Sequence, residues 1–106
     1  MSKRKLIAVT ACVTGIAHTY MAEKALIQAA KKMGILMKVE TQGATGIEHK
    51  LNKKDAQIGE AVVFATDTKV RDEDRFQNKK ILQVTPNDAI KNAQKVITKA
   101  LALADK

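Results

Sequence analysis

Leu6-Ile7-Ala8-Val9-Thr10-Ala11-Cys12-Val13-Thr14-Gly15 starts as an uninterrupted apolar run and ends in a segment that contains a cysteine and a glycine. A short continuous apolar run is typical of a strand that is covered on both faces. Apolar residues then recur at helical spacing, at Ala22, Leu26, Ala29, Ala30 and Met33. Gly34 follows where a helix end favours a left-handed residue. This region therefore predicts a strand, a loop and a helix in succession.

The same alternation continues to the end of the chain. We expect further strands over residues 35–39, 61–65 and 81–84, and a loop over 43–51. We also expect a short helix over 53–58 capped by Asn52, a single turn over 72–76, and one last helix after Thr85-Pro86. Such alternation predicts an α/β fold. We expect an open four-stranded parallel sheet with helices on both faces, in which the strands, numbered along the chain, lie in the order 2-1-3-4. Ligands bind such sheets beyond the carboxyl ends of the strands, at the topological switch point, and Cys12 follows the first strand there.

Composition limits the class of protein. With 106 residues, 45% apolar and 28% charged, the chain fits one globular domain over residues 1–106. No apolar run reaches the ~20 residues that a membrane helix needs, and a single cysteine fits a reducing cytoplasm. We expect a cytoplasmic monomer that does not insert into a membrane.

Charge indicates an anionic partner. The net charge is +8, and residues 1–54 carry ten basic and only three acidic side chains. Aromatic residues make up 3% of the chain, too few to stack on bases as nucleic-acid-binding proteins do. We therefore predict a phosphorylated ligand and no nucleic acid.

The segment after the first strand has the residue types of a phosphoryl-accepting loop. Backbone N–H groups that lead into a helix can bind an anion, and a cysteine there can act as the nucleophile. We predict that Cys12 is catalytic and that the phosphoryl group is bound by Val13, Thr14, Gly15, Ile16, Ala17, His18 and Thr19. Cys12 as a small buried hydrophobic residue, and His18 as a solvated polar residue, are the alternatives.

Cys12-Val13-Thr14-Gly15-Ile16-Ala17-His18-Thr19 resembles the active-site loop of the fructose-type enzyme IIB proteins of the bacterial sugar phosphotransferase system, with Val13 in place of the usual proline. The similarity covers essentially the whole chain. It includes Tyr20-Met21-Ala22-Glu23, Val39-Glu40-Thr41-Gln42-Gly43, Gly46-Ile47-Glu48 and Arg75-Phe76.

This resemblance implies a phosphotransferase that works as a phosphoryl carrier. Its cysteine would accept the group from a phosphohistidine on enzyme IIA. It would then pass the group to a fructose-like sugar held by the membrane component, enzyme IIC. The carrier would need no cofactor and no metal, and would sit at the inner face of the membrane when docked. Gln42 and Gly43 end the second strand beside the loop, and we expect them to contact a partner.

Two alternatives belong to other functional classes. Low-molecular-weight tyrosine phosphatases also have a cysteine loop after the first strand, but with an arginine at the sixth position after the cysteine, where this chain has His18. They also use an Asp-Pro acid, whereas Thr85 precedes the single proline, Pro86. The other alternative is a non-catalytic anion-binding or sensor module. A zinc site formed by Cys12, His18 and His49 lacks ligand spacing, and we interpret Asp67 as structural because its carboxylate would repel phosphate.

Overall fold

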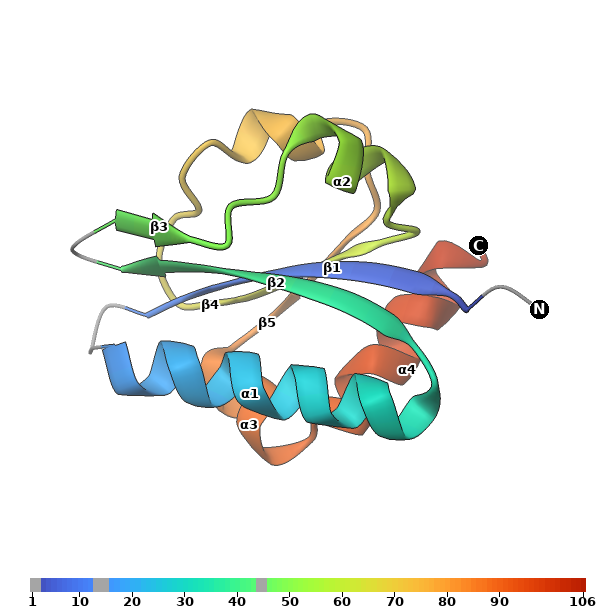
Figure 1. Cartoon of the computed structure of the whole chain (residues 1–106), viewed down its shortest axis with the longest axis horizontal. Coiled ribbons are helices and arrows are strands. Elements are labelled where there is room, and N and C mark those ends of the chain that lie inside the picture. Colours follow the sequence, from blue (N-terminus) through green and yellow to red (C-terminus); the bar gives the residue numbers. More distant parts are fainter. Residues whose placement is uncertain (1–2, 13–15, 44–45) are drawn as a thin grey trace.

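A computed structural model of the chain describes residues 3–12, 16–43 and 46–106. It shows a single α/β domain in which helices cover both faces of a twisted sheet (Figure 1). In these residues the strands are β1 (Lys5–Ala11), β2 (Leu36–Gly43), β3 (Gly46–Glu48), β4 (Val62–Thr66) and β5 (Ile81–Val84). The helices are α1 (Ile16–Met33), α2 (Lys53–Ile58), the 3-10 helix η1 (Glu73–Phe76), α3 (Pro86–Lys91) and α4 (Ala93–Ala104).

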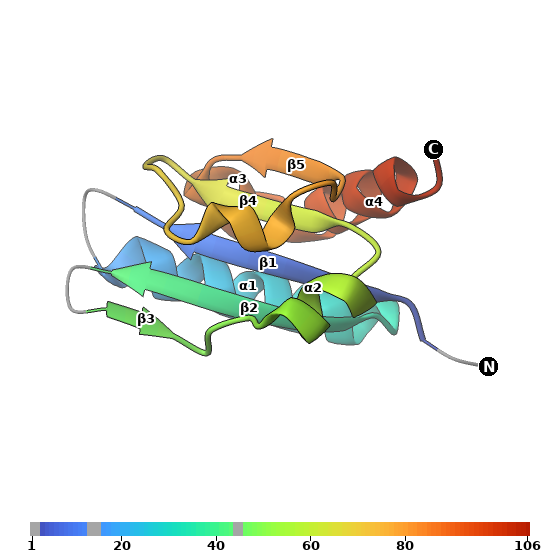
Figure 2. The same cartoon turned by 90° about the horizontal axis from the view of Figure 1, so that it is seen from above.

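The sheet order is β3-β2-β1-β4-β5 within the described part of the chain. The four predicted strands are present in the predicted order and pair in parallel. The prediction of a purely parallel four-stranded sheet is wrong, because β3 adds an antiparallel edge beside β2 (Figure 2). Residues 43–51, predicted as a loop, contain this strand. Three residues are too few to show the alternation of polar and apolar residues by which a strand is predicted.

Each inner strand sends alternate residues to the two faces of the sheet. Leu6 and Ala8 of β1 join the core under α1, α3 and α4, whereas Ile7 and Val9 join the core under α2 and η1. In the second core Phe64 and Phe76 pack edge to face with ring centroids 5.6 Å apart. The continuous apolar pattern of β1 therefore reflects burial on both faces, as the sequence predicts.

Local signals explain most helix boundaries. Gly34 adopts a φ of 70° just after α1, a left-handed conformation that glycine adopts at little cost. Asn52 and Asp55 form a capping box at the start of α2. The predicted single last helix is instead two helices, because Asn92 leaves the helical conformation with φ −134° and ψ 47°.

Candidate functional site

Cys12 lies where the sequence predicts, just beyond the carboxyl end of the central strand. The last residue of β1, Ala11, is paired with Gln42 of β2 on one side and with Thr66 of β4 on the other. The Asp67 backbone N–H donates to the Ala11 carbonyl at 3.1 Å, which extends the β1–β4 pairing to the edge. Cys12, partly exposed, therefore emerges between two strand ends held by backbone hydrogen bonds.

Two ionisable side chains approach the Cys12 sulfur. The thiol donates to Oδ2 of Asp67 at 3.3 Å, and Nδ1 of His18, in the first turn of α1, lies 3.9 Å from Sγ. Both side chains are exposed, and Cys12 itself is partly exposed. The sequence analysis interprets Asp67 as structural, and the structure shows that its carboxylate contacts the Cys12 thiol. The sequence signal that could have found it is its place directly after β4, at the same edge as Cys12.

Only part of the predicted phosphoryl-binding loop lies within the described residues. Val13, Thr14 and Gly15 fall outside them, and Ile16 begins α1. Ala17 and His18 are exposed in the first turn of that helix. Thr19 is buried, and its carbonyl accepts a hydrogen bond from the Thr10 hydroxyl at 3.3 Å. This contact ties the start of α1 to β1. Phosphoryl binding by the loop stays a prediction.

The end of β2 carries a buried polar network. Glu40 is fully buried, and both its oxygens accept from the Arg75 guanidinium, at 2.6 and 2.9 Å. The same carboxylate accepts from the Leu51 backbone N–H and from the Gln42 side chain, each at 2.7 Å. Gln42 also accepts from the Arg71 backbone N–H at 2.8 Å. This network, hereafter the Glu40 network, connects β2 to the segments before α2 and around η1.

The pKa values of the ion pair reflect these contacts. Burial on its own raises the pKa of Glu40, but the hydrogen bonds from Arg75, Gln42 and the Leu51 N–H outweigh it and lower the pKa below its ordinary value. The hydrogen bonds to Glu40 raise the pKa of Arg75. Both groups therefore stay charged.

Gln42 and Gly43 occupy different environments. Gln42 is 4% exposed and its amide is bound within the Glu40 network, which disfavours direct contact between this side chain and a partner. Gly43 is half-buried at the end of β2, opposite Gly46 of β3. Partner contact at this edge stays a prediction.

Comparison with known proteins assigns the chain to a family. The family model described as "PTS system, Lactose/Cellobiose specific IIB subunit" matches residues 7–99. The chain belongs to the IIB family of the phosphotransferase system. The fructose-like EIIB component 2 of Escherichia coli strain K12 is 45% identical over 95 residues, which are 90% of this chain and 90% of the relative. The PTS fructose-specific EIIABC component of Bacillus subtilis is 46% identical over 99 residues, 93% of this chain but only 15% of that longer protein.

A solved structure confirms the fold. The solution structure of a protein described only as uncharacterized has 63% sequence identity and a TM-score of 0.92, and the match covers 98% of both chains. The family assignment confirms the resemblance found in the sequence. Both curated relatives are named as phosphotransferase-system components, one fructose-specific and the other fructose-like.

Two arginines of this IIB chain are engaged away from Cys12. Arg4 binds Glu60 and Asp105 and precedes β1, about 26 Å from Cys12 along the strand at ~3.3 Å per residue. The Arg75 guanidinium is bound to Glu40. Neither is available to clamp a phosphoryl group as the arginine of a phosphatase loop does.

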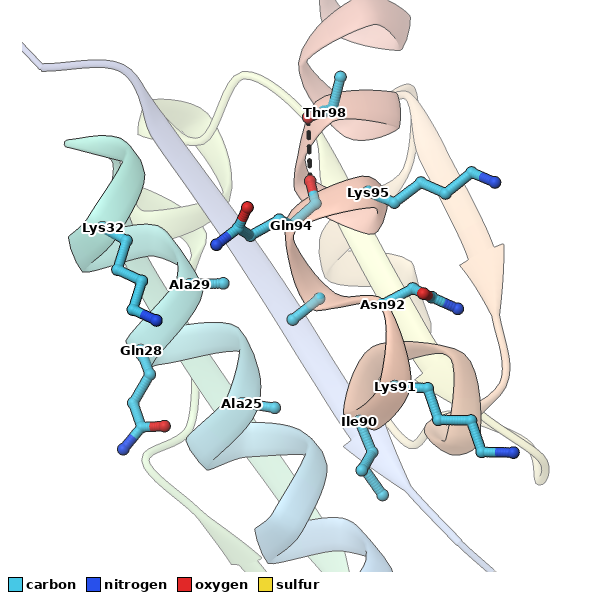
Figure 3. A pocket seen from close by; sticks show the side chains of 11 residues that line it. Ala25, Gln28, Ala29, Lys32, Ile90, Lys91, Asn92, Gln94, Lys95 and Thr98 are labelled. Carbon is cyan, nitrogen blue, oxygen red and sulfur yellow. Dashed lines mark hydrogen bonds between the residues drawn. The ribbon is translucent and has the colours of Figure 1, made fainter.

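A separate groove lies on the helical face, between α1 and the corner where α3 meets α4 (Figure 3). Its volume is about 650 Å³, and three lysines are among its lining residues: Lys32, Lys91 and Lys95. It does not include Cys12, His18 or Asp67, so it is not part of the cysteine site.

The described residues give no sign of a metal centre or of a membrane span. No three histidine, cysteine, aspartate or glutamate side chains among them are placed to share a metal ion. None of the helices in residues 3–12, 16–43 and 46–106 is long and apolar enough to cross a bilayer.

Proposed function

We propose that this IIB chain is a phosphoryl carrier whose covalent intermediate is a phosphocysteine at Cys12. The observation that carries the proposal is the position of the cysteine, at the carboxyl edge of the sheet beside His18 and Asp67, in a chain of the IIB family. The single cysteine of the sequence is accessible at a strand end. The sulfur can attack the phosphorus of a donor there, and the phosphoryl group can then pass from the sulfur to the next acceptor.

In the proposed relay the donor is a phosphohistidine on enzyme IIA and the final acceptor is a sugar bound by enzyme IIC. The sugar class, fructose or a fructose-like sugar, follows the names of the relatives. Residues 1–106 would act as one IIB domain at the cytoplasmic side of the membrane component. The backbone of residues 13–19 would bind the phosphoryl oxygens, and we assign no cofactor to the step.

Intact-mass measurement tests the intermediate. The chain is incubated with the A domain of the Bacillus subtilis EIIABC relative, previously loaded with its phosphoryl group. We expect a mass gain of one phosphoryl unit that Cys12→Ser abolishes and that His49→Gln, on an exposed histidine, retains. Phosphorylation of the serine variant, or a label on a histidine, would contradict the proposal.

The same experiment separates the alternative functions. The fructose-like EIIB component 2 of Escherichia coli serves as a positive control for the donor. If that control is phosphorylated and this chain is not, the chain is an anion-binding or sensor module. Continuous release of inorganic phosphate by this chain would instead indicate a phosphatase-like hydrolase.

A further inference from the structure

Hydrogen bonds at the end of β4 hold Asp67 beside the Cys12 sulfur. Its backbone N–H is bound to Ala11, the residue before Cys12. The preceding residue, Thr66, is 6% exposed, and the Gln83 side chain donates to its hydroxyl at 3.0 Å and to its carbonyl at 3.2 Å. The aspartate therefore continues a strand end that is fixed on both sides, with Oδ2 3.3 Å from the sulfur.

The charge of Asp67 fits the empty carrier but not the loaded one. An ionised carboxylate can accept a hydrogen bond from the thiol, as in the observed S–H···O contact. Beside a phosphoryl dianion on the same sulfur, an ionised carboxylate would be repelled. A protonated carboxyl group has the opposite effect, because its O–H can donate to a phosphoryl oxygen.

We propose that Asp67 is a catalytic residue, the proton acceptor of Cys12 when the phosphoryl group arrives. The inference rests on the proposed carrier function and assigns the proton of that reaction. As sulfur forms its bond to phosphorus, the thiol proton passes to Oδ2 of Asp67. The nitrogen–phosphorus bond of the donor breaks, and its electron pair stays on the imidazole. That ring leaves neutral when its other nitrogen carries a proton. Return of the phosphoryl group to the histidine reverses these movements.

His18 is the competing base, since its Nδ1 lies 3.9 Å from the same sulfur. Asp67 is favoured by the shorter distance and by the thiol hydrogen bond that points to it. The two side chains come from different elements, α1 and the end of β4. Each can therefore be substituted separately.

Single-turnover phosphorylation tests the assignment, with the loaded A domain of the Bacillus subtilis relative as donor. We compare wild type, Asp67→Asn, His18→Gln and the control Asp74→Asn, which removes an exposed carboxylate on η1. At saturating donor we expect Asp67→Asn to slow the step by at least about 100-fold, the lower end of general-base effects. The half-saturating donor concentration should be unchanged, because docking is not the step affected. Asp74→Asn should match wild type.

A second measurement distinguishes proton transfer from a structural role. Asp67→Ala leaves space at an exposed position, so added formate should restore part of the rate while chloride at the same concentration should not. A full rate in Asp67→Asn, a slow rate in His18→Gln alone, or a slow alanine variant without formate rescue would each overturn the inference. If wild type accepts no phosphoryl group from a donor that loads the Escherichia coli control, the carrier proposal fails and this inference fails with it.

Discussion

Glu40→Gln removes one charge from the buried ion pair of β2 and leaves the Arg75 guanidinium in place. Both side chains are shielded, with exposed fractions of 0% for Glu40 and 9% for Arg75. Glutamine has nearly the same shape, so packing is retained while the charge balance is lost. Its amide oxygen can accept from only some of the four donors that Glu40 now satisfies.

The expected loss is large for a domain of this size. Removing one partner of a buried pair costs about 3–5 kcal/mol, mostly because the other charge stays buried without compensation. The total free energy of unfolding of such domains is about 5–15 kcal/mol. At about 4–8 °C per kcal/mol, a loss of ~3 kcal/mol lowers Tm by ~12–24 °C.

Urea unfolding and calorimetry at neutral pH measure this loss, and Glu60→Gln is the matched control. The Glu60 carboxylate also lies 2.6 Å from an arginine, Arg4, but these two side chains are 36% and 37% exposed. Water screens such a pair, so we expect a much smaller loss of stability. Equal losses in the two variants would refute the idea that burial makes the Glu40 network a stabilising element of the fold.

Two more predictions concern stability. The pKa values of Glu40 and Asp55 are lowered in the fold. Their ionised carboxylates therefore stabilise the fold above the unfolded pKa of about 4. This stabilisation is lost as the pH falls through the folded pKa. The Tm of wild type should therefore fall on acidification, and the Tm of Glu40→Gln should fall less steeply. If Tm depends on pH equally in both proteins, Glu40 does not contribute to the acid sensitivity. Asn52→Ala removes the side-chain acceptor of the Asp55 N–H and should cost about 1 kcal/mol in urea unfolding, whereas an unchanged midpoint would show that this cap is dispensable.

Signals that act within a few residues could be predicted from the sequence. Apolar runs, the caps at Asn52 and Thr85, and the left-handed Gly34 each depend on neighbours along the chain. Parallel pairing and the order of four strands followed from the handedness of crossovers. The strand order in turn places Cys12, which follows the first strand, at the topological switch point.

Features that depend on distant contacts could not be predicted in this way. The edge strand β3 is defined by three residue pairs with β2, and the break at Asn92 carries no proline or glycine to mark it. Arg75 lies 35 positions from Glu40, and periodicity alone does not reveal which charge neutralises which. The contact between Asp67 and Cys12 could not be predicted either, because the sequence shows the charge of Asp67 but not the thiol that lies beside it.

The polar interior of this domain is concentrated at the edge that holds Cys12. All the buried polar or charged side chains in the described residues belong to the carboxyl ends of β1, β2 and β4 or to the first turns of α1: Thr10, Thr19, Glu40, Thr41, Gln42 and Thr66. None of the described buried side-chain polar atoms lacks a hydrogen-bond partner, so the cost of burying them is offset locally. The proposed phosphoryl carrier would need Cys12 in a fixed place while its partners bind and dissociate. Internal hydrogen bonds at the ends of β2 and β4 meet that requirement, because they hold the strand ends on both sides of the sulfur without any help from a partner.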